Sequence, residues 1–107
     1  MNLSHAYGTP PAAEAAGALL LRALDRGITH FDTAEVYGPF TNEVVVGQAL
    51  APIRQEVSIA TKFGWDIDPQ TGQRSGGLNS RPDHVRRVVD AMLTRLKVDS
   101  IDLLYQH

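Results

Sequence analysis

Four polar side chains in this sequence are of types suited to proton transfer: Asp32, Tyr37, Lys62 and His107. A tyrosine normally titrates near ~10, so it donates a proton poorly at neutral pH. A neighbouring ammonium stabilises the phenolate and lowers that pKa, and a carboxylate keeps the ammonium charged in a half-buried place. An imidazole can hydrogen-bond a substrate oxygen or relay the proton. Brought together, these groups would form a proton-handling site.

Such a site requires that separate segments converge. The β-branched and aromatic content predicts three strands, over residues 28–34, 57–63 and 100–107. Asp32, Lys62 and His107 lie at or near their C-terminal ends, and Tyr37 follows Asp32 in a short loop. Because strands that alternate with helices run parallel, these ends should gather on one rim, where ligands bind in parallel α/β folds.

The first two predicted helices surround the first strand. Apolar side chains at helical spacing predict a helix over residues 10–26, with Thr9 as its N-cap. A second helix is expected over residues 42–50, capped by Thr41 or Asn42. The β-branched residues 44–46 alone would also allow a strand there.

A third helix follows a long segment, residues 64–79, that we expect to be a loop. Ser80 is its predicted N-cap. The apolar spacing predicts a buried face made of Val85, Val88, Val89, Met92, Leu93 and Leu96. The basic residues Arg86, Arg87, Arg95 and Lys97 are expected on the solvated face.

The strand over residues 57–63 has two different faces. Its bulky side chains are Val57, Ile59, Thr61 and Phe63, and the alternate positions are Ser58, Ala60 and Lys62. Small residues toward a crowded interior and bulky ones toward helices suit a closed barrel.

Composition narrows the class of protein. The chain has 107 residues, a net charge of −2 and no cysteine. The charge gives no reason to expect nucleic acid or an anionic membrane, and the lack of cysteine excludes disulfides and thiolate metal sites. No apolar run is long enough to span a bilayer, and the first residues do not resemble a signal peptide, so we expect a cytoplasmic protein.

The other histidines and the aspartates that could bind a metal are expected to have structural roles. His5, His30 and His84 lie on separate elements without metal-ligand spacing. Asp66 and Asp68 begin like a calcium loop, but the required later glycine and glutamate are missing. No metal site is predicted.

Three motifs resemble those of the aldo-keto reductases. They are the run FDTAEVYG at residues 31–38, TKFG at 61–64 and IDLLYQH at 101–107. Residues 4–8 and the Ser80-Arg81-Pro82 helix start are also similar. In that family an Asp, Tyr, Lys and His tetrad reduces carbonyls with hydride from a nicotinamide cofactor, usually NADPH.

The resemblance carries further expectations. It implies that Asp32, Tyr37, Lys62 and His107 are the catalytic tetrad, that Asp32 also contacts NADP(H), and that the substrate is a small carbonyl compound. The family fold is a (β/α)8 barrel, which takes roughly 250 residues. Residues 1–107 would therefore be a fragment of one barrel domain, with about three strands, corresponding to the second to fourth. We expect such a fragment to be inactive alone, and its oligomeric state is not readable from the sequence.

Two other functions stay open. Lys62 could form a Schiff base, as in barrel aldolases, with Asp32 and Tyr37 transferring protons. The chain could also be a non-catalytic binding subunit, similar to potassium-channel β-subunits that share the barrel. Those subunits depart from the tetrad at the histidine, so His107 favours an enzyme.

Overall fold

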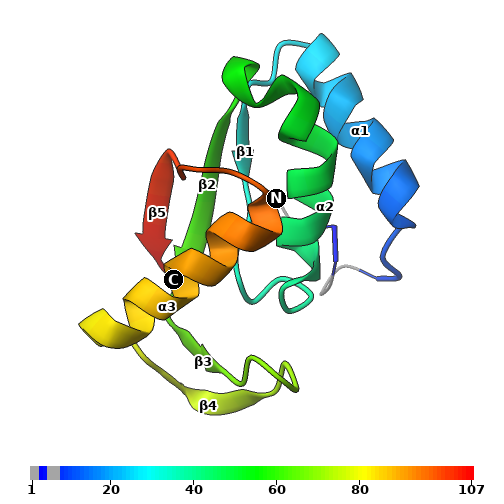
Figure 1. Ribbon diagram of the computed structural model, residues 1–107. Coiled ribbons are helices and arrows are strands. Elements are labelled where there is room, and N and C mark those ends of the chain that lie inside the picture. Colours follow the sequence, from blue (N-terminus) through cyan, green and yellow to red (C-terminus); the bar gives the residue numbers. More distant parts are fainter. Residues whose placement is uncertain (1–2, 5–7) are drawn as a thin grey trace.

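The computed structural model describes residues 3–4 and 8–107. His5 and the two residues after it lie outside the described residues. The described chain contains three α-helices, one 3-10 helix, a three-stranded sheet and a two-stranded sheet (Figure 1). The helices are α1 (Ala13–Asp25), α2 (Thr41–Leu50) and α3 (Pro82–Leu96), and the 3-10 helix is η1 (Ala51–Glu56).

The three-stranded sheet is parallel, as predicted. Its order is β1 (His30–Asp32), β2 (Ser58–Phe63) and β5 (Leu103–Gln106), with β2 in the centre. The outer strands are shorter than predicted. Directly before β5, the Asp102 carboxylate accepts a 2.8 Å hydrogen bond from the Ile59 amide, so a side chain replaces a backbone contact where the strand begins.

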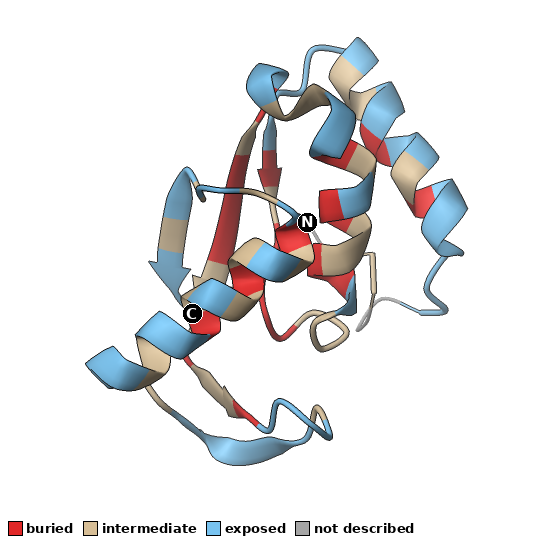
Figure 2. Ribbon diagram, in the orientation of Figure 1, coloured by how far each residue is buried: buried red, intermediate tan, exposed pale blue. Residues whose placement is uncertain are grey.

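One face of the sheet packs against the helices. The main buried cluster joins residues from helices and strands: Leu20, Phe31, Val46, Leu50, Val57, Ile59 and Leu96. Burial of each large side chain contributes roughly 1.5–3 kcal/mol. Figure 2 shows the buried positions concentrated along β2 and on the inner sides of the helices. The predicted buried face of α3 is confirmed, since all six of its apolar residues are buried or half-buried.

The predicted helix caps are wrong, and proline accounts for two of the errors. The N-cap of α1 is Ala12 rather than Thr9, since Pro11 disfavours a helical conformation at the residue before it. The N-cap of α3 is Arg81 rather than Ser80, because Pro82 keeps Arg81 extended. Neither helix has a side-chain cap.

The cap of α2 also differs from the expectation. Phe40, with a φ of 68°, is the N-cap, while Thr41 and Asn42 are already helical. The Asn42 side chain is fully buried and donates a 2.6 Å hydrogen bond to Thr33. The residue predicted to cap α2 therefore ties the helix to the end of β1.

The segment predicted to be a loop contains an antiparallel hairpin, β3 (Trp65–Ile67) and β4 (Arg74–Leu78). Its turn is closed by Asp68, whose side chain accepts hydrogen bonds from the amides of Gln70 and Thr71, and by Gly72 at a φ of 72°. In Figure 1 the hairpin extends beyond the end of β2. We name it the rim hairpin, since it follows the C-terminal end of that strand.

Candidate active site

The register of the sheet brings the predicted tetrad residues of the strands together. Asp32 lies opposite Ala60, two residues before Lys62. Lys62 lies opposite Tyr105, two residues before His107. Because side chains alternate along a strand, an offset of two keeps all three side chains on the same face of the sheet. They meet at the rim formed by the C-terminal ends of the strands.

Lys62 makes the central contacts of the site. Its Nζ donates a hydrogen bond to the Asp32 carboxylate and a second, of 2.8 Å, to the Thr33 carbonyl oxygen. The Lys62 side chain is 16% exposed and that of Asp32 is 32% exposed. Burial raises the pKa of the Asp32 carboxyl, but the hydrogen bond and charge of Lys62 act against burial, and the pKa ends below its ordinary value.

Tyr37 and His107 complete the group. The Tyr37 ring centre lies 5.1 Å from Lys62 Nζ, and the Tyr37 and His107 rings meet edge to face with centres 6.0 Å apart. Partial burial, followed by the positive charge of Lys62, lowers the pKa of His107 below 6.5, and Asp32 partly opposes this. The imidazole is therefore neutral at pH 7 and can either donate or accept a hydrogen bond.

Gly64 fixes the end of β5 against β2. The His107 amide donates a 2.7 Å hydrogen bond to the Phe63 carbonyl oxygen. Gly64 has a φ of +136°, and a Cβ there would lie 3.2 Å from the His107 carbonyl oxygen. Glycine at this position therefore allows the two backbones to approach closely.

A buried ion pair lies behind the site, on the helix side of β2. Thr61 donates a 2.5 Å hydrogen bond to Glu43, which is fully buried. Arg95 Nε donates a 2.6 Å hydrogen bond to the other Glu43 oxygen. The prediction that Arg95 lies on a solvated face is therefore wrong, because its side chain is only 17% exposed.

Trp65 was not singled out in the sequence, although it adjoins the site. Its ring centre lies 6.4 Å from that of His107, and the Arg74 guanidinium lies over the Trp65 ring, 5.2 Å from the ring centre. The sequence signal for Trp65 is its position two residues after Phe63, the last residue of the strand that carries Lys62.

The described residues contain no cluster of three or more His, Asp or Glu side chains suited to a metal ion. Within the same residues, none of the helices combines the length and apolar character needed to cross a membrane.

The comparisons with known proteins agree with this geometry. The model of the aldo/keto reductase family matches residues 1–107. The aldo-keto reductase yakc of Schizosaccharomyces pombe, whose name specifies NADP(+), is 40% identical over 109 residues. That alignment covers 100% of this chain and 31% of the relative.

The chain belongs to the aldo/keto reductase family.

Solved structures of the family resemble the fold. The holo form of aldo-keto reductase AKR11C1 from Bacillus halodurans is 33% identical, with a TM-score of 0.73 over 86% of this chain and 30% of its own. An aldo-keto reductase from Klebsiella pneumoniae in complex with NADPH is 29% identical, with a TM-score of 0.67 over 99% of this chain and 32% of its own. The three parallel strands and their helices are thus part of a (β/α)8 barrel. The chain spans about a third of the length of these relatives.

Proposed function

We propose that the protein carrying this segment reduces aldehydes or ketones to alcohols with NADPH. Tyr37 donates the proton to the carbonyl oxygen, and Lys62 stabilises the phenolate that remains. Asp32 holds the Lys62 ammonium in place, and His107 orients the substrate oxygen. The observation that carries this proposal is the position of Lys62 Nζ, which contacts the Asp32 carboxylate and lies 5.1 Å from the Tyr37 ring centre.

The residues at the rim fit the nicotinamide end of such a cofactor. The Asp32 side chain is 32% exposed and His107 is exposed, so the face of the sheet that carries Lys62 is open to a ligand. Asp32 is the residue that we propose to contact the cofactor. When bound, NADPH supplies the hydride. The neutral His107 imidazole then hydrogen-bonds the substrate oxygen and places it near the Tyr37 hydroxyl.

The Schiff-base alternative is less consistent with the geometry. A lysine attacks a carbonyl only as the neutral amine. Here Lys62 Nζ donates to the Asp32 carboxylate and to the Thr33 carbonyl oxygen, so both contacts use Nζ as a donor rather than as a nucleophile. Reduction with borohydride in the presence of a carbonyl compound should therefore label neither Lys62 nor the control Lys97. Selective labelling of Lys62 would favour an aldolase.

We also propose that residues 1–107 form part of one barrel domain and that reduction requires a longer chain. Apolar side chains near the open face and edges of the sheet are exposed: Ile28 by 49%, Leu103 by 41% and Tyr105 by 44%. Within the described residues, the outer strands β1 and β5 each have one edge with no neighbouring strand, and such edges promote association with other chains. A fluorescence titration of the 107-residue chain with NADPH tests this. Micromolar binding by a monomer together with turnover would contradict it. A cytoplasmic location stays a prediction from the sequence.

The direct test of function uses the longest soluble chain that carries this segment. Tyr37→Phe should lower kcat by ~10²–10⁴-fold toward a panel of aldehydes and ketones. NADPH binding should be nearly unchanged, because the phenol acts on the substrate oxygen. Lys62→Met should also lower kcat, whereas Lys97→Met, at an exposed helix end, is the matched control. Near-complete turnover in Tyr37→Phe would refute the proposed role.

A further inference from the structure

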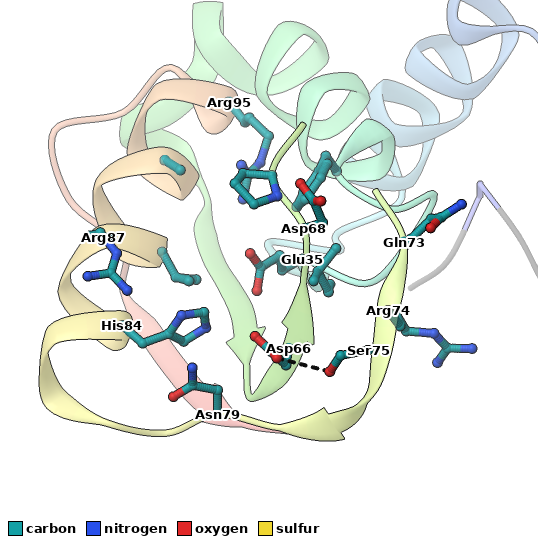
Figure 3. Close-up of a pocket in the computed structure, with 15 residues that line it drawn as sticks. Glu35, Asp66, Asp68, Gln73, Arg74, Ser75, Asn79, His84, Arg87 and Arg95 are labelled. Atoms are coloured by element: carbon teal, nitrogen blue, oxygen red, sulfur yellow. Dashed lines mark hydrogen bonds between the residues drawn. The ribbon is translucent and has the colours of Figure 1, made fainter. Parts of the chain in front are cut away.

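A cavity lies apart from the predicted tetrad residues. Its volume is about 710 Å³, within the usual range for small-molecule sites. The rim hairpin and α3 contribute most of its lining, and none of Asp32, Tyr37, Lys62 or His107 belongs to it. Figure 3 shows Glu35 in the central part of the cavity, with Arg95 above and His84 below in that view.

Three buried polar atoms of the lining have no hydrogen-bond partner among the described residues. They are Glu35 Oε2, His84 Nε2 and Arg95 Nη2. Glu35 is only 6% exposed, so water compensates little for the missing contact. A buried polar group without a partner is unfavourable, and more so when it is charged. Three such groups lining one cavity favour a polar occupant over an apolar one.

The charges of the lining narrow the chemical class of that ligand. Arg95 is already paired with Glu43 through its Nε, and it retains a free N–H on Nη2. An anionic ligand would place its charge beside Glu35, and also beside Asp66 and Asp68, which line the same cavity. A cationic ligand would place its charge beside Arg95. Neither sign of charge suits all of the wall.

Hydroxyl groups suit this cavity wall, because each hydroxyl can both donate and accept a hydrogen bond. A hydroxyl oxygen can accept from Arg95 Nη2, and a hydroxyl proton can be donated to Glu35 Oε2. His84 Nε2 can take either role, according to its tautomer. Burial raises the pKa of the Glu35 carboxyl to about 7, so this group too can act as an acceptor or, when protonated, as a donor.

The remaining wall is partly apolar. Ile67, Val88 and Ala91 line the cavity and can contact the C–H groups of a ligand. Asn79 and Ser75 add neutral polar groups nearer the hairpin. We propose that this cavity binds a neutral polyhydroxylated ligand, a sugar or a polyol, through Glu35, His84 and Arg95.

The test measures binding of sorbitol, D-glucose and sucrose without NADPH, using the longest soluble chain that carries this segment. Saturation-transfer NMR detects contact, and isothermal titration gives the affinity. Two variants remove the contacts, Glu35→Leu and His84→Leu, and Glu56→Leu at the exposed end of η1 is the matched control. A thermal melt of each variant establishes that it is folded. Ala91→Phe fills the cavity from α3 and offers a second route if a polar variant fails to fold.

Saturable binding of at least one of these compounds is expected. The polar variants should weaken it by about tenfold or more, in line with the loss of a hydrogen bond to a charged group. Ala91→Phe should abolish it, and Glu56→Leu should leave it unchanged. Three outcomes would overturn the proposal: no saturable binding by the folded chain, binding that survives the cavity variants, or tighter binding of inorganic phosphate or methylammonium at this site. Since no cofactor is present, these outcomes do not depend on the proposed reductase activity.

Discussion

Thr61 donates a 2.5 Å hydrogen bond to Glu43, at the strand position directly before Lys62. Because Glu43 is also paired with Arg95, one carboxylate joins α2, α3 and the central strand. All of these contacts lie on the helix side of the sheet, opposite the tetrad. The carboxylate therefore supports the segment that carries Lys62 without touching the site itself.

The first prediction concerns this buried pair. Glu43→Leu should destabilise the fold by about 3–5 kcal/mol, because it leaves the Arg95 guanidinium buried without a counter-charge. Urea unfolding monitored by circular dichroism measures the change. The double variant Glu43→Leu, Arg95→Leu should be less destabilised than the single one. Equal or greater destabilisation of the double variant would show that the pair does not act as a unit.

Two glycines in helices give a matched pair for a second prediction. A Cβ at Gly47 in α2 would lie 2.6 Å from backbone atoms of Leu96, so Gly47→Ala should force α2 and α3 apart and destabilise the fold. A Cβ at Gly17 in α1 would meet only Ala49, at an ordinary 3.6 Å. Gly17→Ala should therefore be neutral or stabilise by up to ~1 kcal/mol. In thermal melts, Gly47→Ala should lower the Tm, and Gly17→Ala should leave it unchanged or raise it.

A third prediction concerns the pH dependence of stability. The pKa of Glu35 rises from 4.5 to about 7 in the folded state, chiefly through burial, with Arg95 opposing and Glu43 assisting the rise. Between these values the folded state binds more protons than the unfolded state, so the contribution of Glu35 to stability falls as pH rises. Above about pH 7 the Glu35 carboxylate is charged, and the full cost of burying that charge lowers the stability of the fold.

Glu35→Gln removes this titration. Relative to the parent chain, its free energy of unfolding should be higher at about pH 8 than at about pH 4.5, by ~3 kcal/mol at most. Urea melts at the two pH values measure the difference. Glu56→Gln, at an exposed residue, is the control. A difference that does not change with pH would show that folding leaves the pKa of Glu35 unchanged.

The last prediction concerns the electrostatics of the tetrad. Burial and the Lys62 charge both lower the pKa of His107. Lys62→Met removes the positive charge, so the pKa of His107 should rise toward its ordinary value. An NMR titration of the His107 imidazole protons measures it, with Lys97→Met as the control. An unchanged midpoint in Lys62→Met would place Lys62 too far from His107 for the proposed arrangement.

Local periodicity was enough to predict the parallel sheet and α3. The apolar spacing from Val85 to Leu96 and the alternation over β2 both reflect burial by the nearest neighbours, which a sequence records directly. Part of the site could be predicted in the same way. Asp32 and Lys62 meet as expected, because the parallel strand direction and the two-residue offset determine where their side chains lie.

Contacts between distant segments were not predictable in the same way. Arg95 resembles any solvated arginine of an amphipathic helix, and only its partner Glu43, 52 residues away in sequence, shows otherwise. The rim hairpin was missed since Gly76 and Gly77 in β4 have no side chains to alternate. Glu35 was overlooked because its burial depends on the hairpin and on α3, which follow it in the chain.

The two-residue offset between neighbouring strands has a consequence for insertions and deletions. Deleting one residue of β2 before Lys62 would turn its side chain to the helix face, and deleting two would keep the face but move it by ~6.6 Å along the strand. Neither change leaves Lys62 against Asp32. The turn of the rim hairpin, residues 68–73, lies outside the strand pairing, so a change in its length does not move a side chain to the other face of a sheet. Length changes should therefore be confined to that turn, leaving the strands open to substitution alone.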